Sequence, residues 1–291
     1  MASNLKPVSA VLNAPQPHTV GDGFRVSNFF PAGYQIKMSP FYLLDFNAKT
    51  DLQGSNEPHG VGPNPHRGFE TVTIAYHGSL SHCDSAGNSG IINPGDVQWM
   101  TAASGVLHKE YREQSFNQTG GPFQMAYLWV NLPARDKMSR PRYQHLKRQE
   151  IKTYELPDQA GTVEIIAGAY AGTKGSACTF TPLHVYNARL NSGGEATFTF
   201  PACYNTGFLI VEGSIIINDT DKAKENQFVY FEHSGEEIKV TASENTVILV
   251  MSGEAIDEPL VHYGPFLMNT DEEIKQALND YNQGCFGYLE E

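Results

Sequence analysis

Short apolar runs separated by glycine, proline and asparagine constrain the fold of this chain more than any other feature of its sequence. Residues 58–113 show the pattern best: an alternating run at 71–76 is followed by turn-forming segments at 77–78, 84–87 and 93–96. Alternation of apolar and polar residues predicts half-buried strands, and closely spaced turns predict that successive strands are antiparallel. Few windows have the 3.6-residue apolar period of a helix. The sequence therefore predicts an all-β protein.

The length of the chain, 291 residues, is enough for two domains of ordinary size or for one large β fold. The second half repeats the β-like pattern of the first, and segments 73–79 and 209–214 both run from an apolar strand into a polar-Gly-Ser turn. This echo favours an internal duplication. A charged, proline-containing segment marks a change in composition near the middle of the chain. We therefore expect one domain in residues 1–140 and a second in residues 141–291.

One helix is predicted, at the end of the chain and within the second domain. Thr270 and Glu273 have the spacing of a capping box, and Gly284 is positioned to end the helix. Apolar residues follow the cap at helical spacing, at Ile274, Ala277, Leu278 and Tyr281. This stripe predicts that the helix packs on a sheet rather than on a partner.

The charge balance argues against a nucleic-acid surface. The chain has 20 Lys and Arg against 32 Asp and Glu, which gives a formal net charge of −12, and it contains no basic run. Binding to phosphate backbones requires a basic patch, so no direct nucleic-acid partner is expected. The amino-terminal residues lack the features of a secretory signal, and no apolar run is long enough to cross a bilayer. We therefore expect a soluble, cytoplasmic protein without membrane association.

The cysteines are scattered and form no C-x-x-C pair. Such usage favours free thiols in a reducing compartment over a zinc knuckle or a disulfide framework. The four positions are Cys83, Cys178, Cys203 and Cys285.

Two pairs of polar residues supply the candidate metal ligands. Asn64 and His66 form the first pair, and His108 and Glu110 form the second. Side chains two residues apart share one face of a strand. Two imidazoles and a carboxylate, with an amide oxygen as a weaker fourth donor, are expected of non-haem iron and would also bind Mn, Ni, Cu or Zn. Open coordination positions would permit catalysis, whereas a closed site would only stabilise the fold.

Longer motifs carry a family resemblance. They are NPHRGFETVTI at 64–74, NPGDVQWMTAASGVLHKE at 93–110, AYLWVNLP at 126–133, PRYQ at 141–144 and EPLVHYGPFLMNTDEEI at 258–274. Together they resemble the pirin family of bicupins. The resemblance implies two tandem cupin domains, each a jelly-roll β-sandwich or barrel, with one mononuclear metal site in the first domain and none in the second. Pirin-like proteins resemble quercetin 2,3-dioxygenases, and some act as metal-dependent regulators through protein partners.

The resemblance assigns roles to the two pairs of residues. It implies that His66, His108 and Glu110 bind the metal, with Fe(II) as the expected ion. The family has a histidine where this chain has Asn64, which predicts weaker binding, a preference for harder metals, or a water in that position. Glu110 would also act as the base for a substrate hydroxyl.

Other residues offer alternatives. Glu70 follows His66 at the spacing that ordinary cupins use, and it would share a face with His66 if the strand were regular. His59 could replace the missing imidazole. His77 and His82 flank a predicted hairpin turn and are expected at the surface. The remaining histidines have no partner in sequence and are expected to be structural: His18, His145, His184, His233 and His262.

Trp99 and Met100 precede the second ligand pair. They could line a substrate pocket, although an aromatic residue beside a methionine on a buried strand is usually part of the core.

Three functions follow from these observations. The first is a dioxygenase that acts on a flavonol-like substrate. The second is a metal- or redox-dependent interaction protein that contacts a protein partner without catalytic turnover. The third is a duplicated cupin whose metal site has been lost through the change at Asn64.

Overall fold

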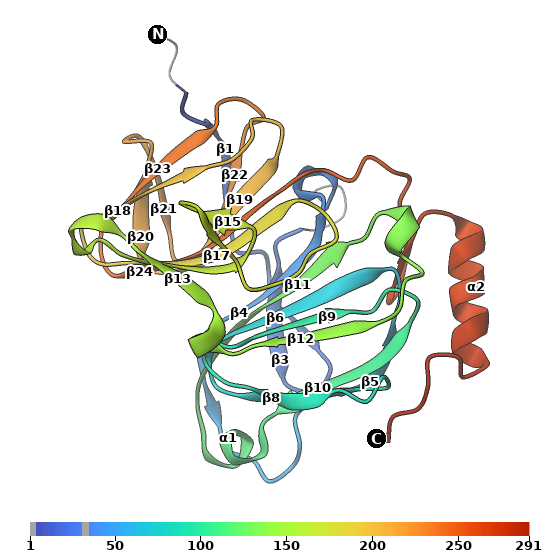
Figure 1. The fold of residues 1–291 in the computed structure, drawn as a ribbon. Coiled ribbons are helices and arrows are strands. Elements are labelled where there is room, and N and C mark those ends of the chain that lie inside the picture. Colours follow the sequence, from blue (N-terminus) through green and yellow to red (C-terminus); the bar gives the residue numbers. More distant parts are fainter. Residues whose placement is uncertain (1–3, 31–34, 291) are drawn as a thin grey trace. The chain divides into compact units, whose positions relative to one another are not determined.

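The computed structural model describes residues 4–30 and 35–290, whose strands and helices are drawn and labelled in Figure 1. The chain forms two compact units that interleave along the sequence. Unit 1 contains Met1–Pro15, Ala32–Pro40 and Gln149–Ala255. Unit 2 contains Gln16–Pro31, Phe41–Arg148 and Ile256–Glu291.

This division differs from the expected split at residue 140. The amino-terminal segment belongs to unit 1, with residues 149–255, and the carboxy-terminal segment belongs to unit 2, with residues 41–148. Strand β1 (Val8–Asn13) pairs with β22 (Gln227–Phe231) in unit 1. The last segment carries β25 (Val261–Tyr263), β26 (Phe266–Met268) and helix α2 (Asp271–Asn282), and it belongs to unit 2. By this division helix α2 lies in unit 2 and not with residues 149–255 of unit 1. An amphipathic helix packs where a complementary apolar surface exists, whatever the order of the chain.

Unit 2 consists of two antiparallel sheets and the segment that ends in α2. The seven-stranded sheet has the order β12 (Arg142–Leu146), β9 (Val97–Thr101), β6 (Phe69–His77), β11 (Gly120–Asn131), β4 (Phe41–Gln53), β3 (Phe24–Asn28) and β2 (His18–Val20). The four-stranded sheet has the order β5 (Gly60–His66), β10 (Val106–Arg112), β7 (Leu80–Asp84) and β8 (Ser89–Ile92).

The chain crosses between these sheets at two of the segments singled out in the sequence. Strand β5 ends at His66 in one sheet, and β6 begins at Phe69 in the other. The turn predicted at 77–78 likewise joins β6 to β7 across the sandwich instead of closing a hairpin. Such crossings place the side chains of β5, β7 and β10 opposite those of β6, β9 and β11.

Unit 1 repeats this plan. Its seven-stranded sheet has the order β1, β22, β19 (Asn205–Glu212), β24 (Thr246–Gly253), β17 (Leu183–Leu190), β14 (Gly161–Ala167) and β13 (Lys152–Glu155). Its four-stranded sheet has the order β18 (Glu195–Thr199), β23 (Glu237–Ala242), β20 (Ser214–Ile217) and β21 (Asp221–Lys224). A separate ribbon is formed by β15 (Ala169–Tyr170) and β16 (Thr173–Lys174). The core is filled with aromatic and aliphatic side chains, among them Tyr186, Phe198, Phe200 and Phe208.

The remaining elements are short. Helix α1 (Gln114–Thr119) is capped by Glu113, whose carboxylate accepts a hydrogen bond from the amide of Phe116. Among the described residues, strands are also connected by the 3-10 helices η1 (Gln35–Met38), η2 (Ala134–Asp136), η3 (Arg148–Glu150) and η4 (Pro157–Gln159).

Helix α2 confirms the predicted capping box: Thr270 and Glu273 each bond to the other's backbone N–H. Ile274 and Ala277 are buried, whereas Tyr281 is 41% exposed. The packed face is therefore shorter than the predicted stripe. The all-β prediction is confirmed in both units, with α2 as the carboxy-terminal helix.

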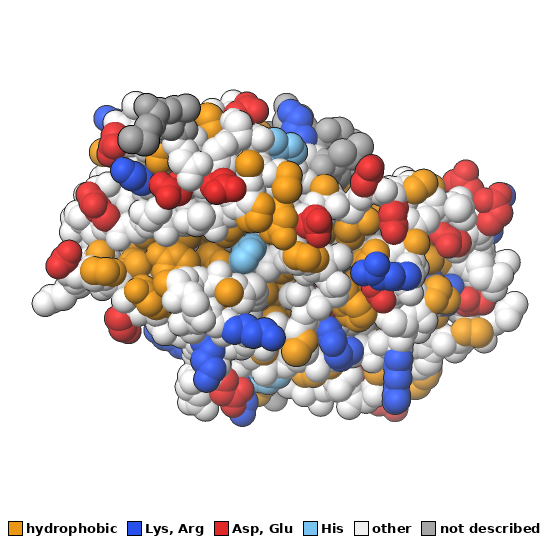
Figure 2. Space-filling model, turned by 45° about the horizontal axis from the view of Figure 1, so that its top comes forward, with side chains coloured by type: hydrophobic (Ala, Val, Ile, Leu, Met, Phe, Trp, Pro, Cys, Tyr) orange, Lys and Arg blue, Asp and Glu red, His pale blue; other side chains and the backbone are white. Residues whose placement is uncertain are grey.

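The distribution of basic side chains and the lengths of the helices agree with the predictions made from composition. On the face that Figure 2 shows, Lys and Arg side chains stand apart from one another among apolar and uncharged side chains. Within residues 4–30 and 35–290, no helix has the length and apolar character needed to span a membrane. The four cysteines are free thiols.

Candidate metal centre

The inward face of the four-stranded sheet of unit 2 carries the predicted ligand side chains. Strand β10 lies between β5 and β7, so that His108 is opposite Asn64 on one side and Asp84 on the other. Glu110 is opposite His82 on β7. Directly paired residues of antiparallel strands share a face, as do residues two apart on one strand. The register therefore brings all four predicted ligand side chains to one face of the sheet.

The three stronger donors are buried and close to one another. Exposed fractions are 5% for His66, 2% for His108 and 6% for Glu110. Glu110 Oε1 accepts a hydrogen bond of 2.8 Å from Thr73 on the facing sheet and lies 4.0 Å from His108 Nε2. The ring centroids of His66 and His108 are 6.0 Å apart. Both sheets thus contribute to the position of Glu110.

Burial sets the protonation states of these groups. Desolvation lowers the pKa of His66 to about 4. Desolvation also lowers the pKa of His108 well below its ordinary value, and the charges of His66 and His82 act in the same direction. Both rings are therefore neutral near pH 7, the form that binds metals. Burial raises the pKa of Glu110 to about 7, against the effect of its hydrogen bond from Thr73, so a nearby cation would favour the ionised carboxylate.

This donor set fits a divalent transition metal. Two neutral imidazoles and a carboxylate are ligands that such ions prefer. Nδ1 of His66 is buried and has no hydrogen-bond partner among the residues that the structure describes. In the same described part of the chain, no three His, Cys, Asp or Glu side chains stand close enough to share an ion as they are. Binding would therefore draw the donors together.

The donors line a cavity of about 290 Å³ whose other walls are mainly apolar. Strands of the seven-stranded sheet supply most of these walls. The lining side chains outside the ligand pairs include Val20, Phe24, Val26, Leu43, Val61, Met125, Tyr127 and Trp129. Asp45 also lines the cavity, and burial raises the pKa of its carboxyl to about 6. A pocket of this kind suits a small, largely apolar ligand with a few polar groups.

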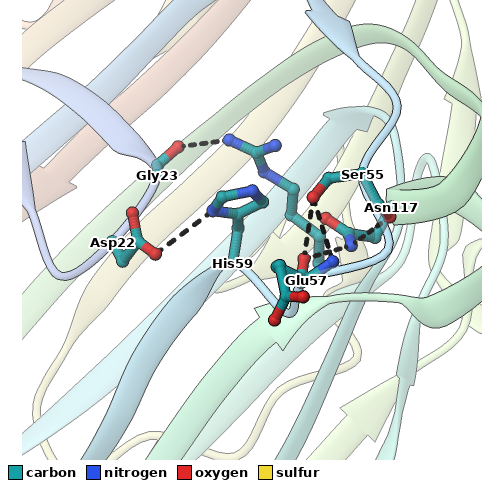
Figure 3. A network of polar contacts seen from close by, with 7 residues as sticks. Asp22, Gly23, Ser55, Glu57, His59 and Asn117 are labelled. Carbon is teal, nitrogen blue, oxygen red and sulfur yellow. Dashed lines mark hydrogen bonds and ion pairs between the residues drawn. The ribbon is translucent and has the colours of Figure 1, made fainter.

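The β2–β3 hairpin forms one wall of the cavity and is tied down at its turn, as Figure 3 shows. Asp22 pairs with His59 at 3.3 Å, and its backbone N–H bonds to the carbonyl of Gly60. Arg112 donates a hydrogen bond of 2.8 Å to the carbonyl of Gly23. His59 is thus engaged at the rim with Asp22 and does not line the cavity that holds Asn64.

The structure does not place Glu70 with the ligand pairs. Glu70 accepts a hydrogen bond of 2.7 Å from Thr101, its partner on β9, whereas Thr73 on the same strand faces Glu110. Residues 70 and 73 differ by an odd number, so they lie on opposite faces of a regular strand. Glu70 would share a face with His66 only if both residues belonged to one continuous strand. The chain instead changes sheets between His66 and Phe69.

The expectation that His82 lies at the surface is wrong. Its side chain is only 5% exposed, and its ring lies 6.0 Å from the ring of His108. Nε2 of His82 is 2.6 Å from the hydroxyl oxygen of Tyr143. The turn beside His82 passes between sheets, so β7 runs along the interior instead of forming an exposed hairpin with β6.

Sequence reasoning also missed Gln98, which is fully buried on β9 with its amide nitrogen 3.2 Å from Nε2 of His108. A polar residue in the middle of a buried apolar run was the available signal. Trp99 and Met100 beside it are buried and do not line the cavity, in agreement with the core interpretation.

Comparison with known proteins places both halves of the chain in one family. The family model described as Pirin matches residues 23–130, and the model described as Pirin C-terminal cupin domain matches residues 185–287. A Pseudomonas aeruginosa protein named "Putative quercetin 2,3-dioxygenase" is 42% identical over 97% of this chain and 99% of its own length. Human Pirin is 33% identical over 99% of this chain and 96% of its own length.

A solved structure extends the likeness to the fold. The crystal structure of quercetin 2,3-dioxygenase from Acinetobacter baumannii has a TM-score of 0.93 and 41% sequence identity, and the match covers 98% of this chain and 100% of that one. The two β-sandwiches are therefore cupin domains, as the resemblance implied. The chain belongs to the pirin family of bicupin proteins.

Proposed function

We propose that this protein is a metal-dependent oxygenase of the quercetin 2,3-dioxygenase type, with one Fe(II) ion in unit 2. The observation that carries the proposal is the cavity into which His66, His108 and Glu110 face, because it combines three buried donors with apolar walls. The names of relatives at 42% and 41% identity support the same reaction.

His66, His108 and Glu110 would hold the ion, with Asn64 as a weak or water-replaced fourth ligand. When bound, a redox-active ion with open positions would bring dioxygen and an oxygen-rich substrate together. Other divalent ions that accept this donor set are Mn, Ni, Cu and Zn.

The residues around the donors suit an aromatic substrate. Trp129 and Phe24 belong to the apolar walls, which would contact the rings of a flavonol-like molecule and exclude water. Thr73 holds one oxygen of the Glu110 carboxylate, which leaves the other oxygen for a substrate hydroxyl. Burial raises the pKa of Glu110 to about 7 in the metal-free chain, and a bound cation would lower it, so the carboxylate would be ionised near neutral pH and able to accept a proton.

Oxygen uptake by the iron-loaded protein tests this function. The protein would be reconstituted with Fe(II) under anaerobic conditions and then mixed with quercetin and oxygen. We expect metal-dependent oxygen uptake, and we expect Glu110→Gln to lower kcat by roughly 100-fold or more, because it removes the base. Loaded protein that consumes no oxygen would contradict the proposal.

That negative result would favour the alternative function, a metal- or redox-dependent interaction protein. Pull-downs with metal-loaded and metal-stripped protein then decide the matter, because the alternative requires different partners in the two forms.

A further inference from the structure

We propose that Gln98 is an additional ligand of the metal centre, through the oxygen of its side-chain amide. The inference rests on the metal site proposed above. It adds a donor from the facing sheet, and this donor belongs to neither of the two ligand pairs identified in the sequence.

Strand β9 holds Gln98 against the ligand pair on β10. Gln98 is opposite Thr73 in the β6–β9 register, and Thr73 bonds to Glu110. The amide nitrogen of Gln98 lies 3.2 Å from Nε2 of His108. The side chain is fully buried, with an exposed fraction of 0%. Gln98 therefore reaches the candidate site from the opposite side of the sandwich.

The other end of the amide group is unsatisfied. Oε1 of Gln98 is buried and finds no hydrogen-bond partner within the described residues. A buried polar atom without a partner destabilises a fold by about 1–3 kcal/mol, so a ligand that gives this side chain a partner would stabilise the site. Within the described residues, no contact other than the one with His108 therefore fixes which end of the amide faces the candidate site.

The geometry allows the amide oxygen to bind without movement of the backbone. A half turn about the last side-chain bond exchanges the nitrogen and oxygen of an amide, which have nearly the same shape. The oxygen would then occupy the position 3.2 Å from Nε2 of His108. Neighbouring ligands at ~2.1 Å from an octahedral ion lie ~3.0 Å apart, which matches this separation closely. Nε2 of His108 also faces Glu110, at 4.0 Å.

An added amide oxygen changes which metals the site prefers. With Gln98, the donors are two imidazoles and the oxygens of Glu110, Asn64 and Gln98. Oxygen donors suit harder ions such as Mn²⁺, whereas imidazole-rich sites suit Zn²⁺ and Cu²⁺. The centre should therefore retain Mn²⁺ better than two histidines and one carboxylate alone would.

A competing role for Gln98 predicts the opposite effect. In its present orientation, the amide N–H can donate to the lone pair of His108 Nε2, which is the lone pair that a metal needs. If that were its function, removal of the amide would strengthen metal binding. The sign of the change in affinity therefore separates the two roles.

The experiment measures the binding of Mn²⁺ by electron paramagnetic resonance of the free ion, and of Zn²⁺ by competition with a chelator. Gln98→Leu removes both amide atoms at similar volume, and Gln98→Glu replaces the amide oxygen with a carboxylate oxygen. We expect Gln98→Leu to weaken Mn²⁺ binding by about tenfold or more and Gln98→Glu to strengthen it. Gln124→Leu is the matched control, because Gln124 is fully buried on the same sheet and does not line the cavity.

Unchanged or tighter Mn²⁺ binding by folded Gln98→Leu would overturn the inference. If that variant fails to fold, Gln98→Glu decides the question alone, and unchanged or weaker binding counts against the role. If His108→Ala abolishes metal binding and Gln98→Leu leaves it unchanged, the inference about Gln98 is wrong and the proposed metal site is still supported. Binding that depends on Gln98 in a protein without oxygen uptake would sustain the inference and refute the oxygenase.

Discussion

At the scale of single residues, Asn64 determines how many imidazoles the centre can offer. It lies opposite His108 across the β5–β10 pair, and its amide nitrogen donates a hydrogen bond of 3.1 Å to the carbonyl of Gly62. That bond leaves the amide oxygen as the donor for a cation. An amide oxygen binds late transition metals less strongly than an imidazole does.

Asn64→His should therefore tighten Zn²⁺ or Ni²⁺ binding by roughly tenfold or more, because an imidazole replaces an amide oxygen at a position that lines the cavity. Competition with a chelator measures the change. Asn56→His is the control, since Asn56 is exposed and outside the cavity. Equal affinities in Asn64→His and the wild type would show that residue 64 does not reach the ion.

Glu70 is a buried carboxylate that is not part of the candidate metal site. Burial raises its pKa to about 7 from an ordinary value of 4.5, although Thr101 donates a hydrogen bond to it. Between these two pH values the folded chain retains a proton that the unfolded chain has released. Its contribution to stability therefore declines as the pH rises from about 4.5 to about 7.

We expect Glu70→Gln, which cannot ionise, to gain stability relative to the wild type over that pH interval and to keep a constant advantage above it. The relative gain should be of the order of 3 kcal/mol, which corresponds to the change in pKa. Urea denaturation of both proteins at several pH values provides the measurement. A stability difference that is independent of pH would refute the expectation.

At the scale of elements, the β2–β3 hairpin is joined to the rest of unit 2 by hydrogen bonds at its two ends and by core packing between them. Ser27 and Asn28 pair with β4, Phe24 and Val26 pack in a core cluster, and the contacts of Asp22 and Gly23 hold the turn. The contact of Asp22 with His59 is partly exposed, so it contributes little by itself. Close contact of the backbones at Gly21 matters more. A Cβ atom there would lie 2.4 Å from the carbonyl oxygen of Gly60.

Gly21→Ala should therefore release the hairpin from the rim of the cavity. Hydrogen exchange of residues 18–28 should rise, and exchange in α2 should stay unchanged. Gly284→Ala is the matched control: Gly284 also has a positive φ, but its Cβ would meet nothing within 4 Å. Left-handed strain alone costs about 1–2 kcal/mol in both variants. Equal exchange of the hairpin in the two variants would mean that the clash at Gly60 is unimportant.

At the scale of the whole molecule, each sandwich is completed by a segment from the distant end of the sequence. In unit 2, Arg67 is 4% exposed, pairs with Asp280 at 2.8 Å and donates to the carbonyl of Ser104. Lys137 is buried and donates to the carbonyls of Gly68 and Leu267, while burial lowers the pKa of its ammonium group to about 7. The final segment thus fixes the chain immediately after His66.

Removal of residues 256–291 should destabilise unit 2 and leave unit 1 folded. The truncation uncovers Phe69 and Trp129, which pack in one core cluster with Leu267, and leaves the Arg67 guanidinium without its carboxylate. Calorimetry should show loss or downward shift of one unfolding transition, together with weaker metal binding. Asp280→Asn should produce a smaller shift in the same direction. Retention of both transitions at full cooperativity would contradict this account.

The comparison of the two units explains why a duplicated fold has one candidate metal centre. The inward strands of unit 2 carry His66, His108 and Glu110 around a cavity. In unit 1, aromatic rings such as Phe198 and Phe208 pack at a centroid separation of 5.4 Å in the core. The same architecture therefore encloses either a polar site or a filled interior, depending on which side chains point inward.

The sequence by itself determined the features that depend on neighbouring residues. Alternation predicted the strands, the two-residue spacing put each ligand pair on one strand face, and the capping box located α2. The family motifs then identified the bicupin fold. Each of these signals is short-range, because strand direction, side-chain alternation and helix capping are set within a few residues.

Only the tertiary structure decided which distant side chains meet. Glu70 lies away from the candidate site because the chain changes sheets before β6. His82 is buried because the chain changes sheets again after β6. Gln98 reached His108 because β9 lies across the sandwich from β10. The last segment joined unit 2 instead of the domain next to it in sequence. The physical reason is the same in each case: sheet crossings and strand pairing depend on the burial of whole faces, which residues adjacent in sequence do not encode.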